Sequence, residues 1–174
     1  YDTMLKMYTK YVCQLMEFIM EGLFEGFLGD RLKRVIPTTP LAMVAQLCSM
    51  VEVQCADLKI QPQESLLENI FIQSLIWSLG ASLLEKERLK FSDAIRKLSE
   101  LPLVNNNSAI NLGQLPGNER ILHDYYFDLE TLQWVSWNQY VPAYQHNRQL
   151  PFHQILVPTL DTVRHTWYVS ISFF

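Results

Sequence analysis

Glycines and paired carboxylates are the residues here that could take part in nucleotide chemistry, and their spacing does not form a site. A phosphate-binding loop follows the pattern G-x-x-x-x-G-K-[ST], in which backbone amides surround the phosphates. The sequence has six glycines, and none of them is followed by lysine. No apolar run ends in an Asp-Glu pair that could hold magnesium and a hydrolytic water. We therefore expect no catalytic residue, no metal site and no cofactor for this chain alone, and no unaided hydrolysis of ATP.

The histidines and cysteines do not have the spacing of a metal site or of a catalytic nucleophile. The sequence contains no H-x-x-x-H, no C-x-x-C and no G-x-S-x-G elbow. The histidines are interpreted as scattered surface residues: His123, His146, His153 and His165. The cysteines are odd in number and lie in apolar helical patterns, which predicts buried free thiols in a reducing compartment. They are Cys13, Cys48 and Cys55.

Asp161 and Arg164 stand three residues apart after an apolar run. They could form a charged pair beside a ligand. A surface ion pair of small energetic value is the default interpretation of the same spacing. Both hypotheses stay open at the level of the sequence.

The composition argues against nucleic-acid and membrane partners. Of the 174 residues 49% are hydrophobic, the formal net charge is −4, and no stripe of lysine or arginine appears. The most membrane-like stretch, residues 69–84, is shorter than the roughly 20 apolar residues that a spanning helix needs. The first residues lack the pattern of a signal peptide. We therefore expect a cytoplasmic protein with a packed core.

The first two predicted helices differ in how clearly their ends are marked. Residues 3–27 carry apolar side chains at spacings of three and four, and Gly26 and Gly29 are expected to close this helix. Thr39 as an N-cap and Pro40 at the first helical position predict the start of the second helix. The apolar stripe of the second helix is expected at Leu41, Val44, Leu47, Cys48 and Val51.

The next two predicted helices form the centre of a bundle. SLLE at residues 65–68 has the pattern of a capping box and opens the third helix. Apolar residues nearly surround this helix, and Gly80 after it is tolerable only where packing is close. The fourth helix is expected to end at Pro102. The bundle should bury Phe18, Val44, Leu47, Phe71, Leu75, Trp77 and Phe91.

After the fourth helix the pattern becomes strand-like. Short aromatic-rich strands are predicted at residues 123–128 and 133–137, and residues 129–131 between them could form a hairpin connection. A further apolar run, residues 155–157, is expected to be a short strand that Pro158 stops.

The predicted fold class is mainly α, with a helical bundle followed by a small strand-containing segment. We expect the bundle to span residues 1–101 and a long polar connection to span residues 102–122. Residues 123–174 would then be the incomplete start of a second unit.

Three stretches together resemble the dynein heavy chain family. ILVPTLDTVR at residues 155–164 is similar to the segment I/L-x-V-P-T-x-D-T-x-R that opens the third AAA+ module ahead of its phosphate-binding loop. WVSWNQYVP at residues 134–142 matches the W-x-x-W…V-P pattern just upstream. NIFIQSLIWSLG at residues 69–80, followed by RLKF at residues 88–91, resembles the lid helices of the second module. Their order and spacing agree, and the overall texture favours the axonemal branch.

This resemblance implies a non-catalytic piece of a motor ring, spanning the AAA+ lid of the second module and the first strands of the third. The parent would bind ATP or ADP with magnesium and convert hydrolysis into movement along microtubules in cilia and flagella. The implied partners are neighbouring AAA+ modules of the same heavy chain, microtubules, and dynein intermediate and light chains, all within the axonemal cytoskeleton. Four residues would line the adenine side of the third module's pocket in the intact parent: Leu156, Val157, Pro158 and Thr159.

The sequence departs from the family pattern after Arg164. The family continues through a helix and a strand into a phosphate loop, whereas this sequence ends at Phe174, which is expected to reflect a truncation or an alternative transcript. The alternative hypothesis is a freestanding helical protein-interaction domain with a strand-rich appendage. The two hypotheses differ in the second half, because a short aromatic hairpin alone is only marginally stable.

Overall fold

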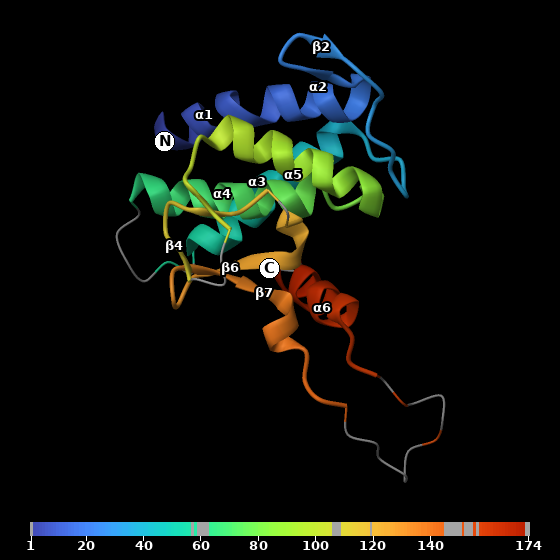
Figure 1. Cartoon of the computed structure of the whole chain (residues 1–174), viewed down its shortest axis with the longest axis vertical. Helices are drawn as coiled ribbons and strands as arrows, with labels where there is room; N and C mark the ends of the chain where they lie inside the picture. Colours follow the sequence, from blue (N-terminus) through green and yellow to red (C-terminus); the bar gives the residue numbers. More distant parts are fainter. Residues whose placement is uncertain are drawn as a thin grey trace.

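The computed structural model describes residues 2–56, 58, 63–105, 109–118, 120–144, 151, 155 and 157–172. The chain is mainly helical with a few short strands, which confirms the predicted fold class. Figure 1 shows the N-terminal helices above the remaining bundle helices, with the small sheet and the C-terminal helix α6 (Leu160–Ser172) below them. The first and last helices therefore lie on opposite sides of the central helices in this view.

The N-terminal helical segment is shorter than predicted. It consists of α1 (Asp2–Met7), a π-helical turn η1 (Tyr8–Val12) and α2 (Cys13–Glu21). It ends because Gly22 adopts a left-handed conformation with φ of 79°, which glycine alone reaches without a steric cost. The next residues form a hairpin of β1 (Leu23–Phe24) and β2 (Phe27–Leu28). The prediction of helix up to residue 27 is therefore wrong at this end.

Helix α3 (Pro40–Ala56) begins where the sequence predicts. The Thr39 hydroxyl accepts a hydrogen bond from the Ala42 N–H at 3.2 Å, and Pro40 occupies the first helical position. The predicted stripe is wrong in its rotation, because Leu41 is 80% exposed and Cys48 is exposed. Almost every side of this helix is apolar, so the spacing alone does not single out one face. The buried residues are Met43, Leu47, Met50 and Gln54.

Helix α4 (Glu64–Ser78) is the central helix, as predicted. Leu66 and all residues from 69 to 78 are buried. The predicted capping box is wrong, because the N-cap is Gln63 and its side chain makes no capping hydrogen bond. Glu68 has other partners: the Lys10 ammonium lies 2.9 Å from its carboxylate, and the Tyr11 hydroxyl donates to it at 2.6 Å.

Helix α5 (Glu85–Ser99) packs beside α4 with the close approach that Gly80 predicts. A Cβ at residue 80 would lie 2.6 Å from Cε1 of Phe91 and 2.7 Å from the Ile76 carbonyl oxygen. The helix ends at Glu100, which has a φ of 58° and donates its N–H to the Arg96 carbonyl. It therefore stops shortly before Pro102.

The aromatic hairpin is confirmed. Strands β6 (Tyr125–Asp128) and β7 (Gln133–Ser136) pair in antiparallel fashion, and β4 (Ile110–Asn111) adds to the other edge of β7. The predicted strand residues 123 and 124 belong instead to a 3₁₀ turn, η2 (Leu122–Asp124). A second 3₁₀ turn, η3 (Trp137–Tyr140), follows the hairpin.

The connection between the helices and the hairpin packs onto the bundle. It contains β3 (Leu103–Val104), which pairs in parallel with β5 (Leu115–Pro116). The Arg96 guanidinium of α5 donates to the Pro116 carbonyl at 2.8 Å, and the Leu122 N–H donates to the Ser92 hydroxyl at 3.0 Å. Residues of the connection thus complete the hydrogen bonds of helix α5.

The hydrophobic core runs from the helices into the sheet. Phe127 and Trp134 of the hairpin are as buried as the helical residues. Phe18 and Val44 are only half-buried, so the prediction is wrong in part for these two. The predicted core residues that are buried are Leu47, Phe71, Leu75, Trp77 and Phe91. Within the described part of the chain, no helix is long and apolar enough to cross a membrane.

The three cysteines are free, but they are less buried than predicted. Cys13 and Cys48 are exposed, and Cys55 is half-buried. Burial raises the pKa of the Cys55 thiol. The helices that carry the cysteines are apolar on more than one side. Cys13 and Cys48 lie on sides that no other described part of the chain covers.

Candidate functional site at the start of the C-terminal helix

The residues predicted to line an adenine pocket lie immediately before α6. Ile155 and Val157 belong to no strand, so the predicted strand is wrong at these positions, and Leu156 lies outside the described residues. Val157 is 48% exposed and Pro158 is half-buried. Proline has no N–H for a strand ladder, and the residues after it start a helix instead.

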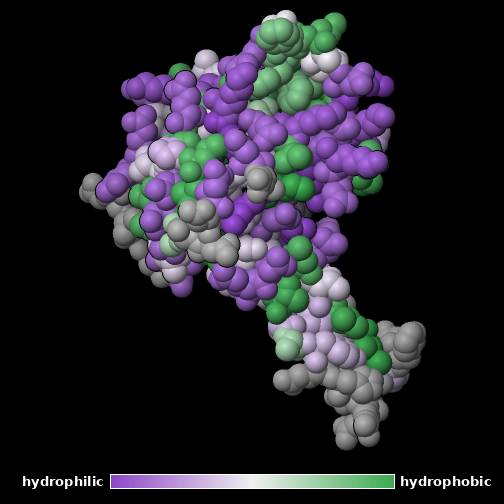
Figure 2. Space-filling view, in the orientation of Figure 1, coloured by the Kyte–Doolittle hydropathy of each residue, from purple (hydrophilic) through white to green (hydrophobic). Residues whose placement is uncertain are grey.

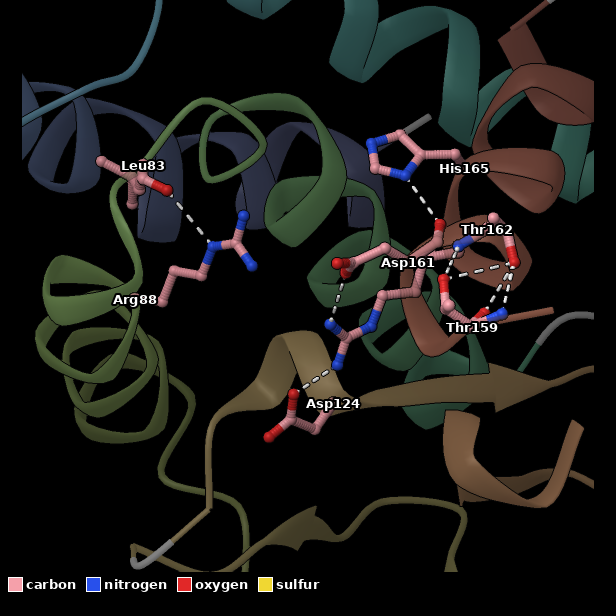
Figure 3. Close-up of polar contacts among 8 residues, drawn as sticks. Leu83, Arg88, Asp124, Thr159, Asp161, Thr162 and His165 are labelled. Carbon is pink, nitrogen blue, oxygen red and sulfur yellow. Dashed lines mark hydrogen bonds and ion pairs between the residues drawn. The ribbon is translucent and has the colours of Figure 1, made fainter. Parts of the chain in front are cut away.

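Thr159 and Thr162 form a reciprocal cap at the N-terminus of α6. The Thr162 N–H donates to the Thr159 hydroxyl oxygen at 3.2 Å, and the Thr159 N–H donates to the Thr162 hydroxyl oxygen at 2.8 Å. Figure 3 shows both side chains turned toward each other across the first turn. This is capping-box geometry with threonine in the place usually taken by glutamate. The P-T-x-x-T pattern therefore fixes the residue at which α6 begins.

Arg164 connects α6 to the turn that precedes the hairpin. The guanidinium pairs with Asp124 of η2 and lies 3.4 Å from the Asp161 carboxylate one turn earlier. Its side chain is 8% exposed, whereas that of Asp161 is 75% exposed. The predicted pair between Asp161 and Arg164 thus forms, and Arg164 is its buried member. A buried guanidinium needs such partners, because an unpaired buried charge is strongly destabilising.

A second arginine, Arg88 of α5, faces the same group of charges (Figure 3). Its Nε donates to the Leu83 carbonyl at 3.2 Å. Burial lowers the pKa of Arg88, and the nearby Arg164 lowers it further, while Asp161 acts in the opposite direction. Charges from α5, η2 and α6 therefore meet in one place, although their residues are far apart in the sequence.

An aromatic cluster lies beside these charges. Trp77 of α4 contacts Trp167 of α6 at a centroid distance of 5.8 Å, and Trp137 of η3 contacts Trp167 at 5.4 Å. Tyr126 stacks on Trp137 at 4.7 Å. An open cavity of about 690 Å³ adjoins the cluster. It is lined by Tyr126, Trp137, Tyr140, Pro142, Pro158, Thr162, Val163, Thr166 and Trp167.

His123 is a buried structural residue and not a surface residue as predicted. It is 1% exposed, and its Nε2 lies 3.1 Å from the Gly80 carbonyl oxygen, which places the proton on Nε2. Burial is the main cause that lowers its pKa to about 3, so the ring is neutral at physiological pH. His165 is exposed as predicted, and His146 and His153 lie outside the described residues. Among the described residues, no three histidine, cysteine or acidic side chains are grouped to hold a metal ion.

The arrangement is suited to joining elements. Ion pairs and aromatic contacts attach α6 to α4, to η2 and to the hairpin, and the cavity beside Pro158 and Thr162 is lined mostly by apolar and aromatic side chains. These groups can bind and orient a neighbouring surface or a planar ring.

A comparison with protein families identifies this architecture. The family model described as "Dynein heavy chain AAA lid domain" matches residues 4–139, which run from within α1 through α5 and the hairpin. The chain belongs to the dynein heavy chain family. The resemblance predicted from the three sequence stretches is confirmed at this level, while the assignment to the second and third modules stays a prediction.

Known relatives extend over nearly the whole of this dynein chain. It is 41% identical over 165 residues to dynein axonemal heavy chain 10 of Homo sapiens, covering 94% of the chain and 4% of that relative. It is 32% identical over 173 residues to the dynein-1-alpha heavy chain, flagellar inner arm I1 complex, of Chlamydomonas reinhardtii, again covering 97% of the chain and 4% of the relative. The chain thus spans about 4% of the length of these axonemal relatives.

Sequence reasoning missed the cap and the long-range partner of Arg164. The cap has a local signal, since threonine at the N-cap and three residues later is a variant of a known box. The pairing of Arg164 with Asp124 has no local signal, because 40 residues separate them. The same holds for Trp77 and Trp167, which meet only through the packing of α6 on α4.

Proposed function

We propose that this chain is a non-catalytic structural part of an axonemal dynein ring, comprising the lid of the second AAA+ module and the start of the third. Its parent heavy chain would couple ATP hydrolysis to movement along microtubules in cilia and flagella. The matched lid family supports the first half of this proposal, and the VPTLDTVR pattern at residues 157–164 supports the second.

The contact between α6 and the lid is the observation that carries the proposal. Arg164 of α6 pairs with Asp124, and Trp167 packs on Trp77 of the lid helix α4. A helix held in this way would move together with the lid, and it would carry the start of the following module with it. We infer that the role of the chain in the ring is to connect neighbouring AAA+ modules of the same heavy chain.

The nucleotide site of the proposal lies at residues 156–159. We propose that Leu156, Val157, Pro158 and Thr159 line the adenine side of a pocket that is complete only in the parent, where ATP or ADP with magnesium would bind. Pro158 borders the aromatic cavity, and Val157 is 48% exposed and free to contact a ring. The phosphates would be bound by a loop that this sequence does not contain.

Calorimetry with ATP and with ADP, each with magnesium, tests the non-catalytic role. For the 174-residue chain we expect no hydrolysis and no binding tighter than roughly millimolar, which corresponds to about −4 kcal/mol. Base contacts alone are weak without the backbone amides that bind phosphate. A micromolar dissociation constant would show that the chain contains a complete nucleotide site, and the proposal would be withdrawn.

The adenine-side assignment is tested in a heavy-chain segment that extends through the following phosphate-binding loop. We expect Val157→Asp to weaken ATP binding by more than tenfold, because a charged carboxylate would replace an apolar side chain against the base. Val169→Asp is the matched control, since Val169 is also 48% exposed and lies later in α6. Equal affinities for the two variants would contradict the assignment.

A freestanding helical interaction domain is the competing function. Affinity purification of the endogenous polypeptide decides between the two, because a ring component is recovered as part of a full-length heavy chain. Recovery of a stable 20.4 kDa polypeptide without a heavy chain would favour the competing function.

A further inference from the structure

Four aromatic side chains from β6, η3 and α6 form walls of the cavity beside α6. They are Tyr126, Trp137, Tyr140 and Trp167, and we call them the aromatic box. Tyr126 stacks on Trp137 and forms one wall with it. The Tyr140 ring stands at 76° to Tyr126 with a centroid distance of 5.3 Å, and the Trp167 ring stands at 65° to Trp137. Rings that meet at such angles enclose a space on more than one side, which a single parallel stack does not.

The aromatic box can be reached from the surface. Tyr140 is 44% exposed, and Tyr126 and Trp167 are half-buried, whereas Trp137 is buried. In Figure 1 the orange turn after β7 lies beside α6, and Figure 2 shows hydrophobic residues around α6 below a largely hydrophilic face. The cavity of about 690 Å³ has the size of a site for a small ligand.

The polar groups on these walls are already engaged with one another. The Tyr126 hydroxyl donates to the Tyr140 hydroxyl at 3.2 Å, and the Thr166 hydroxyl donates to the Thr162 carbonyl at 2.8 Å. The Thr162 hydroxyl belongs to the cap of α6. Nε1 of Trp137 is buried without a partner in the described part of the chain, so this indole can meet a ligand only with its ring carbons. The walls therefore suit a ligand that is bound through aromatic faces and needs few hydrogen bonds.

The charged groups around the aromatic box are acidic. A second hollow of about 410 Å³ shares the walls Tyr126, Tyr140 and Trp167 and is also lined by Asp128 and Glu130. Among the described residues that line the two hollows there is no lysine, arginine or histidine. Burial is the main cause that raises the pKa of Tyr126, and the hydrogen bond to Tyr140 and the charge of Asp128 add to it, so its hydroxyl stays neutral. Two carboxylates attract a cation and repel an anion such as a phosphate.

We propose that the aromatic box, together with Asp128 and Glu130, is a binding site for a quaternary ammonium group, such as the head of choline or the side chain of a trimethylated lysine. Aromatic faces attract such a cation through the quadrupole of each ring. A primary ammonium has three N–H donors that need acceptors, whereas a quaternary ammonium has none. The site is independent of the adenine-side assignment, because it takes a cation and not a nucleotide.

Two ligands of equal shape test the requirement for a cation. Proton NMR follows the titration of the 174-residue chain with choline and with the uncharged alcohol in which carbon replaces the nitrogen of choline. We expect choline to bind roughly tenfold more tightly, with its N-methyl signal shifted upfield by the aromatic rings. Absence of choline binding, equal affinities for choline and the alcohol, or tighter binding of adenosine than of choline would overturn the site.

Two tyrosines provide matched variants. Tyr140 and Tyr144 are both 44% exposed, but Tyr140 lines both hollows and Tyr144 lines neither. We expect Tyr140→Leu to weaken choline binding about fivefold, while Tyr144→Leu and Tyr140→Phe, which keep all four rings of the box, stay within about twofold of the native chain. Thermal melting of each variant checks that the fold is retained. Unchanged choline affinity in a folded Tyr140→Leu chain would refute the site.

A pair of peptides distinguishes the two sources of the ammonium group. One short peptide carries a trimethylated lysine, and the other has the same sequence with unmodified lysine. Tighter binding of the methylated peptide than of choline identifies a protein side chain as the ligand, whereas binding of choline at least as tight as that of the methylated peptide identifies a small molecule. Equal affinities for the two peptides, both above that for choline, would show that the quaternary ammonium is not what is recognised.

Discussion

At the scale of single residues, polar groups with long-range partners determine how the bundle closes. Lys10 donates to the Ser99 carbonyl at 3.0 Å and pairs with Glu68, so one ammonium joins the N-terminal segment to α4 and to the end of α5. Burial is the main cause that raises the pKa of Tyr11, and its hydrogen bond to Glu68 adds to the effect. Tyr11 therefore stays a hydrogen-bond donor at any ordinary pH.

His123 makes the stability of the chain depend on pH. Its pKa in the folded chain is about 3, below the ordinary value of 6.5, so the unfolded chain takes up a proton that the folded chain excludes. The contribution of His123 to stability is constant above about pH 6.5 and is lost as the pH falls toward 3, with a limiting slope of about 1.4 kcal/mol per pH unit. Urea unfolding between pH 7 and pH 4.5 should show this slope in the native chain and a smaller one in His123→Gln. Parallel pH profiles would contradict the assignment.

Gly80 tests the close approach between α4 and α5. A Cβ at this position would meet the Phe91 ring at 2.6 Å, so we expect Gly80→Ala to destabilise the chain by about 1–3 kcal/mol in urea unfolding. Gly29→Ala is the control, because the nearest atom to its Cβ is the Gly22 carbonyl oxygen at 3.9 Å. We expect the control to lie within about 0.5 kcal/mol of the native chain. Similar losses in both variants would mean that the approach at Gly80 is not tight.

At the scale of elements, the ends of the helices show what local sequence can predict. Thr39 accepts a hydrogen bond from the N–H of Ala42, only three residues later, and Pro40 lies between them. The predicted start of α3 is therefore correct. Glu68 has the spacing of a capping residue, but Lys10 and Tyr11 bind it from a segment far away in the sequence. Local patterns are therefore reliable where no distant partner competes for the same side chain.

The difference between local patterns and distant partners also explains which features of the candidate site the sequence predicts. The aromatic hairpin was predictable from its two short aromatic-rich runs, and the pairing of Asp161 with Arg164 was predictable from their spacing. The strand expected before Pro158 was wrong at Ile155 and Val157, because its apolar run is too short to distinguish a strand from a loop that leads into a helix. The partner of Arg164 in η2 depends on the three-dimensional packing of α6, which no spacing in the sequence encodes.

The central position of α4 is tested by paired truncations of leucine side chains. Leu75 of α4 is 0% exposed, so Leu75→Ala should reduce the free energy of unfolding by about 2–5 kcal/mol. Leu41 of α3 is 80% exposed, and Leu41→Ala should cost less than about 0.5 kcal/mol. Chemical denaturation of the two variants under the same conditions is the measurement. A loss below roughly 1 kcal/mol for Leu75→Ala would show that α4 is not the core of the bundle.

At the scale of the whole molecule, the bundle helices and the hairpin that follows them share one core. Phe127 of the hairpin donates its N–H to the Gln73 side chain of α4, and Arg96 of α5 donates to the Pro116 carbonyl. The match to the lid family likewise continues to residue 139. The expected boundary at residue 101 stays a prediction, and these contacts suggest the variant that tests it.

Two truncated chains locate the end of the folding unit. A chain of residues 1–144 keeps the hairpin and η3, whereas a chain of residues 1–101 exposes Gln73, Phe91 and Trp77 to water. We expect the longer chain to unfold cooperatively in urea, because it keeps the contacts of the hairpin with α4. The shorter chain should lose most of its cooperativity, since burying these residues supplies several kcal/mol of the 5–15 kcal/mol that stabilise a typical domain. Equal stability of the two chains would place the boundary at residue 101 and make the hairpin a separate element that belongs to the following unit.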